Sequence, residues 1–145
     1  MSRFQNPAPQ AIRELLDRSR TLAVVGLSDD PSRPSFGVSQ SMQQMGYRIL
    51  PVNPSLQEWQ GIPAYPTIAA AAAALAPGER IDIVNVFRRP AQVDAVVDEC
   101  LRLGIGALWL QQGVINEPAA ERAAASGMTV VMDRCIYVDR VSLPG

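Results

Sequence analysis

The residues best suited to bind a ligand follow a short apolar run near the start of the chain. The run AVVG ends at Gly26, and Ser28, Ser32, Arg33 and Ser35 come before the next segment of helical spacing. Hydroxyl and guanidinium groups bind phosphate, and the free N–H groups of a helix N-terminus favour an anion at the same place. The loop is therefore interpreted as a phosphate-binding loop, with a plain connection between two elements as the alternative.

Two adjacent arginines form a second candidate binding segment, in the string FRRP from Phe87 to Pro90. The proline holds Arg89 in an extended conformation, so the side chains of Arg88 and Arg89 are expected to diverge. A planar guanidinium binds phosphate and also stacks on an adenine ring. Exposure of both arginines to solvent is the alternative interpretation.

Amide side chains follow two further apolar runs. Gln111 and Gln112 can orient a ligand but do little proton chemistry. The string PVNPS has no acid before Glu58, whereas an NAD site usually has an acid after its second strand to hold the ribose. NAD is therefore disfavoured, although Asn53 can still bond a sugar, and Asn53-Pro54 can also be a simple turn.

The string MDRC brings Asp133, Arg134 and Cys135 to the last predicted strand end. An Asp133–Arg134 pair that organises this loop is expected. Cys135 would lie at the ligand edge, where under oxidation its thiol could form a mixed disulfide with a ligand thiol. Cys100 falls on an apolar helix stripe and is expected to be structural. The absence of a C-x-x-C pair fits free thiols in a cytoplasmic protein.

Two absences limit the chemistry available to this chain. It has no histidine, and all 13 basic residues are arginine. Histidine bases, histidine metal sites, lysine Schiff bases and a Walker-type phosphate loop are excluded, which favours a binding protein without metal over an enzyme. The net charge of -1 is spread along the chain, so no nucleic-acid partner is indicated. No apolar run could span a bilayer, and MSRFQNPAPQ lacks the apolar core of a signal peptide.

Alternating elements must position these residues. A single domain over 1–145, with an α/β fold and a mainly parallel sheet, is predicted because buried strands and amphipathic helices alternate. Ser35, Thr67 and Asn116 are expected to cap helices, and ligands of such sheets bind at the carboxyl ends of the strands. The predicted strands are 21–28, 47–54, 81–87, 106–111 and 128–133, the predicted helices 9–18, 36–45, 67–76, 90–103 and 116–125, and the tail 134–145 can add an edge strand.

Six strings in this order resemble one protein family. The strings VVGLS…RPS, YRILPVNP, IDIVNVFRRP, WLQQGV, NE and VVMDRC are similar to those of the small stand-alone coenzyme A-binding proteins. Their fold is that of the N-terminal coenzyme A-binding domain of the succinyl-CoA synthetase α subunit. The resemblance covers about residues 12–140. It implies a Rossmann-like three-layer α/β/α sandwich of five or six strands that binds coenzyme A, or an acyl-CoA, at the carboxyl edge of the sheet.

The resemblance also implies site residues. In the synthetase domain, the loop after the first strand holds coenzyme phosphate, and segments after the third and fourth strands line the nucleotide. Arg48 is taken as the match of a lysine that contacts the coenzyme, and the synthetase has an acid where Gln112 stands. The candidate cofactor-binding residues are Gly26, Leu27, Ser28, Arg33, Ser35, Arg48, Asn53, Pro54, Phe87, Arg88, Arg89, Pro90, Leu110, Gln111 and Gln112.

The resemblance does not extend to catalysis. The synthetase carries a phosphohistidine on a second domain, and this chain has no histidine. It is therefore expected to hold coenzyme A or a short acyl-CoA and to be non-catalytic by itself, with no protein partner indicated. The alternatives are an NAD(P)-binding oxidoreductase or redox sensor, and a regulatory interaction domain.

Overall fold

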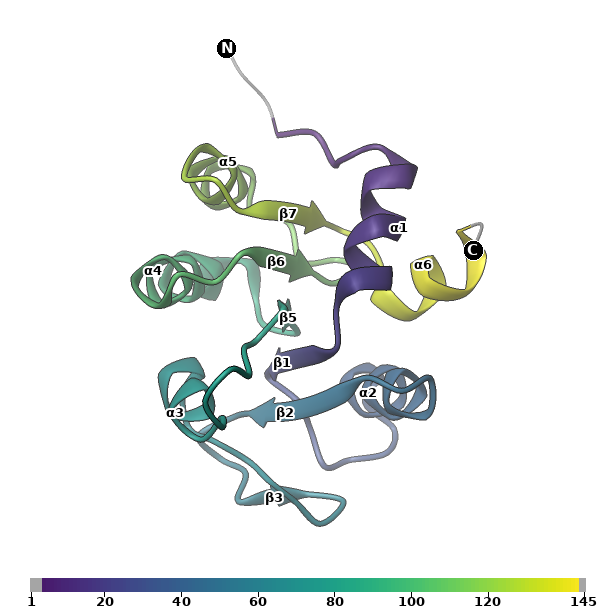
Figure 1. The fold of residues 1–145 in the computed structure, drawn as a ribbon, viewed down its shortest axis with the longest axis vertical. Coiled ribbons are helices and arrows are strands. Elements are labelled where there is room, and N and C mark those ends of the chain that lie inside the picture. Colours follow the sequence, from purple (N-terminus) through teal and green to yellow (C-terminus); the bar gives the residue numbers. More distant parts are fainter. Residues whose placement is uncertain (1–3, 144–145) are drawn as a thin grey trace.

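A sheet of five parallel strands forms the centre of the computed structural model, which describes residues 4–143 (Figure 1). The strands lie in the order β2-β1-β5-β6-β7. In chain order the elements are α1 (Pro9–Arg18), β1 (Thr21–Val25), α2 (Pro34–Gln44), β2 (Arg48–Val52), β3 (Glu58–Trp59), β4 (Ile62–Pro63), α3 (Ile68–Ala73), β5 (Ile83–Val86), the 3-10 helix η1 (Pro90–Gln92), α4 (Val93–Leu103), β6 (Ala107–Leu110), α5 (Glu117–Ala125), β7 (Thr129–Met132) and α6 (Ile136–Ser142).

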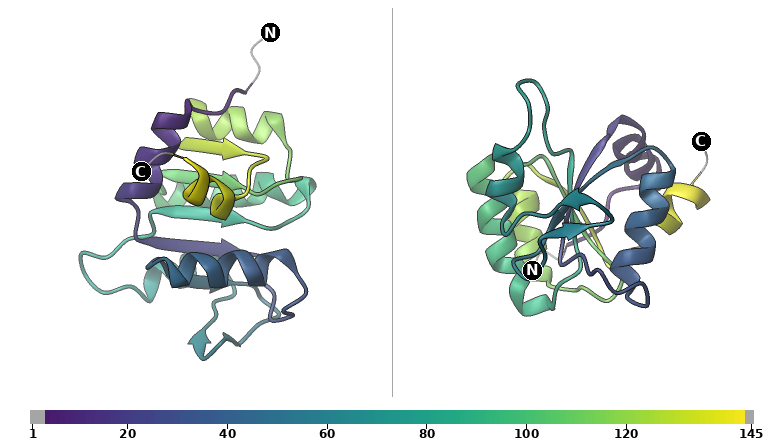
Figure 2. Two further views of the ribbon diagram at one scale, coloured as in Figure 1. Left: turned by 90° about the vertical axis from the view of Figure 1, so that its right-hand side faces the viewer. Right: turned by 90° about the horizontal axis from the view of Figure 1, so that it is seen from below.

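Helices cover both faces of this sheet (Figure 2). The helices α3, α4 and α5 pack on one face, and α1, α2 and α6 pack on the other. Successive residues of a strand alternate between the two cores, so Ala23 of β1 faces the first group of helices and Leu22 faces the second. All five residues of β1 are buried. The predicted three-layer α/β/α sandwich is therefore confirmed.

The strand order places a change of direction in the middle of the sheet. The chain runs from β1 to β2 on one side and then returns to β5 on the other side of β1. The loops that leave β1 and β5 therefore diverge, which opens a crevice at the carboxyl ends of these strands. Parallel sheets of this kind bind ligands at that point.

Local signals set several helix ends as the sequence predicts. Thr67 and Asn116 accept the N–H groups of Ala70 and Ala119, at 3.0 and 3.1 Å, and so cap α3 and α5. Gly104 ends α4 with a φ of 70°, a left-handed conformation that suits glycine.

The predicted start of α2 is corrected. Arg33 is the N-cap residue and Pro34 takes the first helical position, because its fixed φ suits the start of a helix. Ser35 therefore lies inside the first turn, where it is 4% exposed. Its Oγ accepts the N–H of Ser28 at 3.0 Å instead of capping the helix. Met45, the C-cap residue of α2, is 37% exposed.

The C-terminal segment is a helix, α6, and not the sixth strand that was considered. The position such a strand would need beside β7 is taken at Met132 by Asn6. The Asn6 carboxamide donates to the Met132 carbonyl at 3.0 Å and accepts its N–H at 2.7 Å. In α6, Ile136 and Asp139 point inward and are buried, at the i, i+3 spacing of a helix face.

A short hairpin interrupts the segment between β2 and α3, which the sequence predicts only as a loop. β3 and β4 pair antiparallel around Gln60 and Gly61, whose φ values of 50° and 80° fit a two-residue hairpin turn. The chain then returns along β2, where Tyr65 donates to the Pro51 carbonyl at 2.9 Å. This return covers the outer edge of β2.

Candidate functional site

A cavity of about 1020 Å³ opens at the carboxyl edge of the sheet. Its walls come from the loops after β1, β5 and β6, the start of α2, and the segment before α6. The structure therefore brings together strand ends that are far apart in the sequence. The candidate residues that line the cavity are Gly26, Ser28, Arg33, Ser35, Asn53, Phe87, Arg88, Arg89, Pro90, Gln111 and Gln112.

Four candidate residues lie outside the cavity wall. Leu27 and Leu110 have 0% exposed surface and belong to the hydrophobic core, and Pro54 is not part of the lining. Arg48 is the first residue of β2, so it lies at the amino edge of the sheet, opposite the cavity. The candidate set is corrected by leaving Arg48 out, because a residue that begins a parallel strand cannot reach the edge where the strands end.

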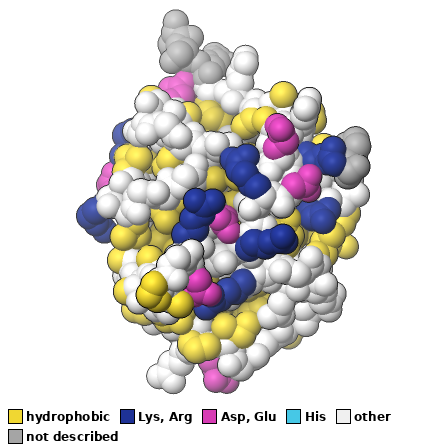
Figure 3. All heavy atoms as spheres, viewed as in Figure 1, with side chains coloured by type: hydrophobic (Ala, Val, Ile, Leu, Met, Phe, Trp, Pro, Cys, Tyr) yellow, Lys and Arg dark blue, Asp and Glu magenta, His cyan; other side chains and the backbone are white. Residues whose placement is uncertain are grey.

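The amino edge carries paired charges. Arg48 contacts Glu79 at 3.1 Å, and Arg80 contacts Asp82 at 3.1 Å. Hydrogen bonds from the Ala76 N–H and from Arg48 hold the pKa of Glu79 below its ordinary value. Figure 3 views this edge, where arginines alternate with carboxylates. The amino edge is therefore a mixed-charge surface.

Some lining residues were not predicted from the sequence. Val38 lies one turn along α2 from Ser35, so helical spacing could have identified it. Gly113 and Val114 follow the two glutamines on the same loop. The unpredicted lining residues are Pro34, Val38, Gln92, Gly113 and Val114, and Cys135, which was expected at this edge, also lines the cavity.

Gly26 holds the first loop against the neighbouring strands. Its N–H donates to the Val52 carbonyl at 2.8 Å, and its φ is +86°. A Cβ at this position would collide with the carbonyl oxygen of Phe87 and lie 3.2 Å from Nε of Arg88. The close approach that requires glycine here is therefore to the backbone of the FRRP segment.

The acidic side chain of Asp30 is engaged within its own loop. Its Oδ1 accepts the N–H and the hydroxyl of Ser32, at 2.9 and 2.8 Å. These two hydrogen bonds hold the pKa of Asp30 below its ordinary value, so the carboxylate stays ionised. Asp30 is not part of the cavity wall.

The cavity is positively charged by composition. Arg33, Arg88 and Arg89 line it, and no lining residue is acidic. Within residues 4–143, none of the three arginines forms an ion pair with a carboxylate. The first turn of α2 has no acidic residue either, and no side chain caps it. Three guanidinium groups and an open helix N-terminus therefore face one cavity, an arrangement that attracts an anion.

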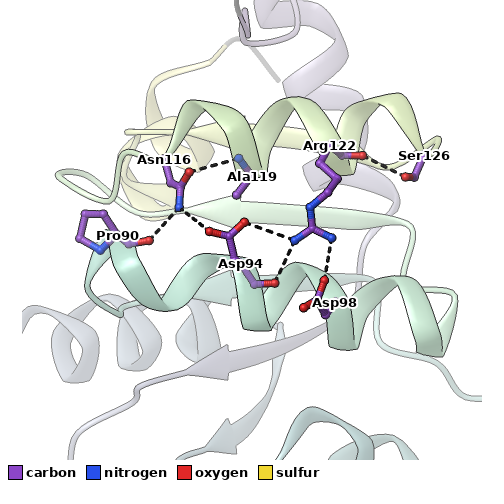
Figure 4. Close-up of polar contacts among 7 residues, drawn as sticks. All are labelled: Pro90, Asp94, Asp98, Asn116, Ala119, Arg122 and Ser126. Carbon is purple, nitrogen blue, oxygen red and sulfur yellow. Dashed lines mark hydrogen bonds and ion pairs between the residues drawn. The ribbon is translucent and has the colours of Figure 1, made fainter.

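A polar network fixes the loop that carries two of these arginines (Figure 4). Arg89 has φ -62° and ψ 147°, the extended conformation predicted for a residue before proline. The carbonyl of Pro90 accepts a hydrogen bond from Nδ2 of Asn116 at 2.9 Å. Arg122 of α5 forms ion pairs with Asp94 and Asp98 of α4, at 3.3 and 2.6 Å, and so joins these two helices. The start of α5 is thereby tied to the arginine loop.

The last strand end is organised differently from the predicted Asp133–Arg134 pair. Arg134 binds Asp139 with two hydrogen bonds of 2.6 and 2.8 Å, and these raise the pKa of its guanidinium. Asp133 instead accepts the N–H of Gly113 at 2.8 Å. The predicted pair is wrong because α6 brings a buried carboxylate back over the loop.

The site offers hydrogen-bond donors and positive charge but few groups for proton transfer. Its polar side chains are hydroxyls, amides, guanidinium groups and the thiol of Cys135. Residues 4–143 contain no cluster of three His, Cys, Asp or Glu side chains that could hold a metal ion. Across the same residues, every helix is too short or too polar to cross a membrane.

Comparison with known proteins adds one family and several relatives. Residues 20–140 match the family model described as CoA binding domain. The uncharacterized protein YneT of Bacillus subtilis is 45% identical over 135 residues, which are 93% of this chain and 96% of that protein. The structure of cell-free ID.343 from Thermus thermophilus is 37% identical, with a TM-score of 0.83 over 95% of this chain and 100% of that chain. The dinucleotide-forming acetyl-coenzyme A synthetase 1 of Ca. Korarchaeum cryptofilum is 25% identical, with a TM-score of 0.67 over 83% of this chain and 27% of that chain.

Proposed function

Because the chain belongs to the CoA binding domain family, as the sequence resemblance predicted, we propose that it binds coenzyme A or a short acyl-CoA at the carboxyl edge of its sheet. The observation that carries this proposal is the cavity lined by three arginines and by no carboxylate. Coenzyme A has a diphosphate and a 3′-phosphate, so it presents several negative charges to such a surface. The protein is proposed to be non-catalytic by itself.

The phosphate groups are assigned to the part of the cavity formed by the loops after β1 and β5 and the start of α2. Ser28, Arg33 and Ser35 surround the N-terminus of α2, and Arg88 and Arg89 lie on the neighbouring loop. Backbone N–H groups at a helix start and guanidinium groups both bind phosphate. The volume of about 1020 Å³ supports a ligand of nucleotide size.

The composition of the lining supports binding without catalysis. A general base near neutral pH is usually a histidine, a carboxylate or a lysine, and the lining contains none of these. Both cysteines are free thiols, which supports the cytoplasmic location expected from the sequence.

The lining weighs against the alternative of NAD(P). No carboxylate is available for the ribose hydroxyls that an acid holds in many NAD sites. Asn53, which stands at that strand end, uses its Nδ2 on the Leu27 carbonyl and its Oδ1 on the Ser55 N–H, at 3.0 and 2.9 Å. Its carboxamide is therefore committed to the protein.

Calorimetric titration with coenzyme A, dephospho-CoA and NAD at two salt concentrations tests the proposal. Coenzyme A should bind most tightly, because a charge-assisted contact to its 3′-phosphate is worth about 1.5–3 kcal/mol, or about tenfold to hundredfold in affinity. Dephospho-CoA should bind less tightly than coenzyme A, and NAD least tightly of the three. The difference in affinity between coenzyme A and dephospho-CoA should shrink as salt screens the charges. Equal affinity for NAD and coenzyme A would overturn the proposal in favour of a dinucleotide-binding protein.

The arginine assignment has a matched control. Arg88→Ala should lower coenzyme A affinity by about tenfold or more, since it removes a phosphate contact. Arg102→Ala makes the same charge change on the exposed end of α4, outside the cavity, and should leave the affinity nearly unchanged. Equal losses in the two variants would show that only the general charge of the protein matters.

A further inference from the structure

Cys135 places a thiol in the wall of the carboxyl-edge cavity. It lies directly before α6 and is partly exposed, whereas Cys100 has 0% exposed surface in α4 on the other face of the sheet. Burial raises the pKa of Cys100 to about 12, so that thiol stays protonated as well as shielded. Of the two cysteines, Cys135 is the one a ligand in the cavity can contact.

A buried amide beside Cys135 is open to a ligand. Gln111 is 3% exposed, and its Oε1 accepts the N–H of Ile136, the residue after Cys135, at 3.0 Å. Its Nε2 donates to no group within residues 4–143, although Gln111 lines the cavity. This nitrogen is not among the fully buried side-chain atoms that lack a partner, so it is accessible and can donate to an acceptor in the cavity. The amide carbonyls of a pantetheine arm are acceptors of this kind.

The loop after β1, which carries Ser28 and Arg33, and Cys135 are separated along the sheet edge. Ser28 follows β1 and Gln111 follows β6, with β5 between these strands. Two strand spacings correspond to about 10 Å. Coenzyme A carries its phosphates and its thiol at opposite ends of a pantetheine arm. If the phosphates lie at the loop after β1, an arm that follows this edge leads toward Gln111 and Cys135.

We propose that Cys135 forms a mixed disulfide with coenzyme A in this cavity, so that the protein is loaded covalently when coenzyme A is oxidised. This inference rests on the proposed function. The Cys135 thiolate attacks one sulfur of coenzyme A disulfide, a new sulfur–sulfur bond forms, and the original one breaks. The second coenzyme A leaves as its thiolate, so the disulfide supplies the oxidising equivalent and no other oxidant is needed. A free thiol reverses the step by the same exchange.

Intact-mass measurement of the whole chain tests this step. The protein is incubated without reductant in coenzyme A disulfide, and separately in glutathione disulfide at the same concentration. Wild type and Cys100→Ala should each gain one coenzyme A, and Cys135→Ser should gain none. The rate with coenzyme A disulfide should exceed that with glutathione disulfide by about tenfold or more, because the arginines hold the nucleotide. Arg88→Ala should reduce this advantage.

Two results would overturn the inference. One is equal adduct in wild type and Cys135→Ser, which would place the reaction elsewhere. The other is an equal rate with the two disulfides, which would make Cys135 a merely accessible thiol. Titration of wild type with coenzyme A in the presence of a reductant distinguishes failure of the mixed-disulfide inference from failure of the proposed function. Tight binding there with no adduct under oxidising conditions would reject the mixed disulfide alone, and absence of binding would reject the proposed function itself.

Discussion

The backbone at Gly26 is fixed by two neighbouring strands at once. Its N–H bonds the end of β2, while its Cα packs against the Phe87 carbonyl after β5. The loop after β1 and the FRRP segment therefore have one fixed separation. That separation sets the distance between Ser28 and Arg88, which line the same cavity.

Gly26→Ala should destabilise the fold by about 2 kcal/mol or more, because the added Cβ meets the Phe87 carbonyl and φ is positive. Urea unfolding measures the change in the free energy of unfolding. Gly37→Ala is the control: it lies in α2 with nothing within 4 Å of an added Cβ. Alanine there should stabilise the helix by about 0.5–1 kcal/mol. A Gly26→Ala protein as stable as wild type would show that the loop relaxes freely.

The buried thiol of Cys100 makes stability depend on alkaline pH. Its pKa is raised from 9.0 to about 12 by burial, so the folded state keeps a proton that the unfolded chain loses. The resulting stabilisation is complete below pH 9 and is lost as pH rises toward 12, at up to about 1.4 kcal/mol per pH unit. Urea unfolding at pH 8, 9.5 and 10.5 should show this fall, and Cys100→Ala should show a smaller one. Parallel curves for the two proteins would contradict the assignment.

At the scale of elements, α5 supports the arginine loop through Asn116. The Oδ1 of Asn116 caps α5, while its Nδ2 donates hydrogen bonds to the Pro90 carbonyl and to Asp94. One side chain therefore joins the helix start to the segment that carries Arg88 and Arg89. Asn116 therefore fixes the position of Pro90, the residue that follows the two arginines.

Two substitutions separate these roles of Asn116. Asn116→Ala should lower the free energy of unfolding by about 1–2 kcal/mol, because the cap is lost. Asn116→Ser keeps a capping oxygen and should recover most of this stability, but it cannot reach Pro90. Both variants should weaken coenzyme A binding to a similar degree in calorimetric titration. Full affinity in Asn116→Ser would mean that the bond to Pro90 does not position the loop.

The elements also show what the sequence could and could not predict. The buried run of β1 and the caps at Thr67 and Asn116 are local signals, and each was interpreted correctly. The meeting of these loops around a cavity at the carboxyl edge was also predictable, because the ends of parallel strands meet at one edge. Arg48 was assigned to the site although its position at the start of a strand already places it at the amino edge. The helix α6 could not be predicted from local signals, because the place of an edge strand beside β7 is taken at Met132 by Asn6, which is 126 residues away in the sequence.

For the whole molecule, the distribution of charge matters more than the net charge of -1. At the amino edge Arg48 pairs with Glu79 and Arg80 with Asp82, whereas the three cavity arginines form no ion pair within residues 4–143. The carboxyl edge therefore offers an anionic ligand the attraction of positive charge that no carboxylate of the cavity wall neutralises.

Coenzyme A should therefore raise the melting temperature. A ligand that binds only the folded state stabilises it by about 2.7 kcal/mol at a hundredfold excess over its Kd. For a chain of this length that corresponds to a rise of about 5–10 °C. Thermal unfolding at increasing coenzyme A concentration measures the rise, and Arg88→Ala should show a smaller one. A melting curve unmoved by millimolar coenzyme A would contradict the proposed function.

The contact of Asn6 with Met132 has a consequence for solubility. An unpaired outer strand offers its backbone groups to another chain and can start aggregation. Asn6 occupies both backbone groups of Met132, and Tyr65 covers the other outer strand, β2. Asn6→Ala should therefore change stability little but open β7 to a second molecule. Light scattering during heating should detect larger particles in this variant than in wild type.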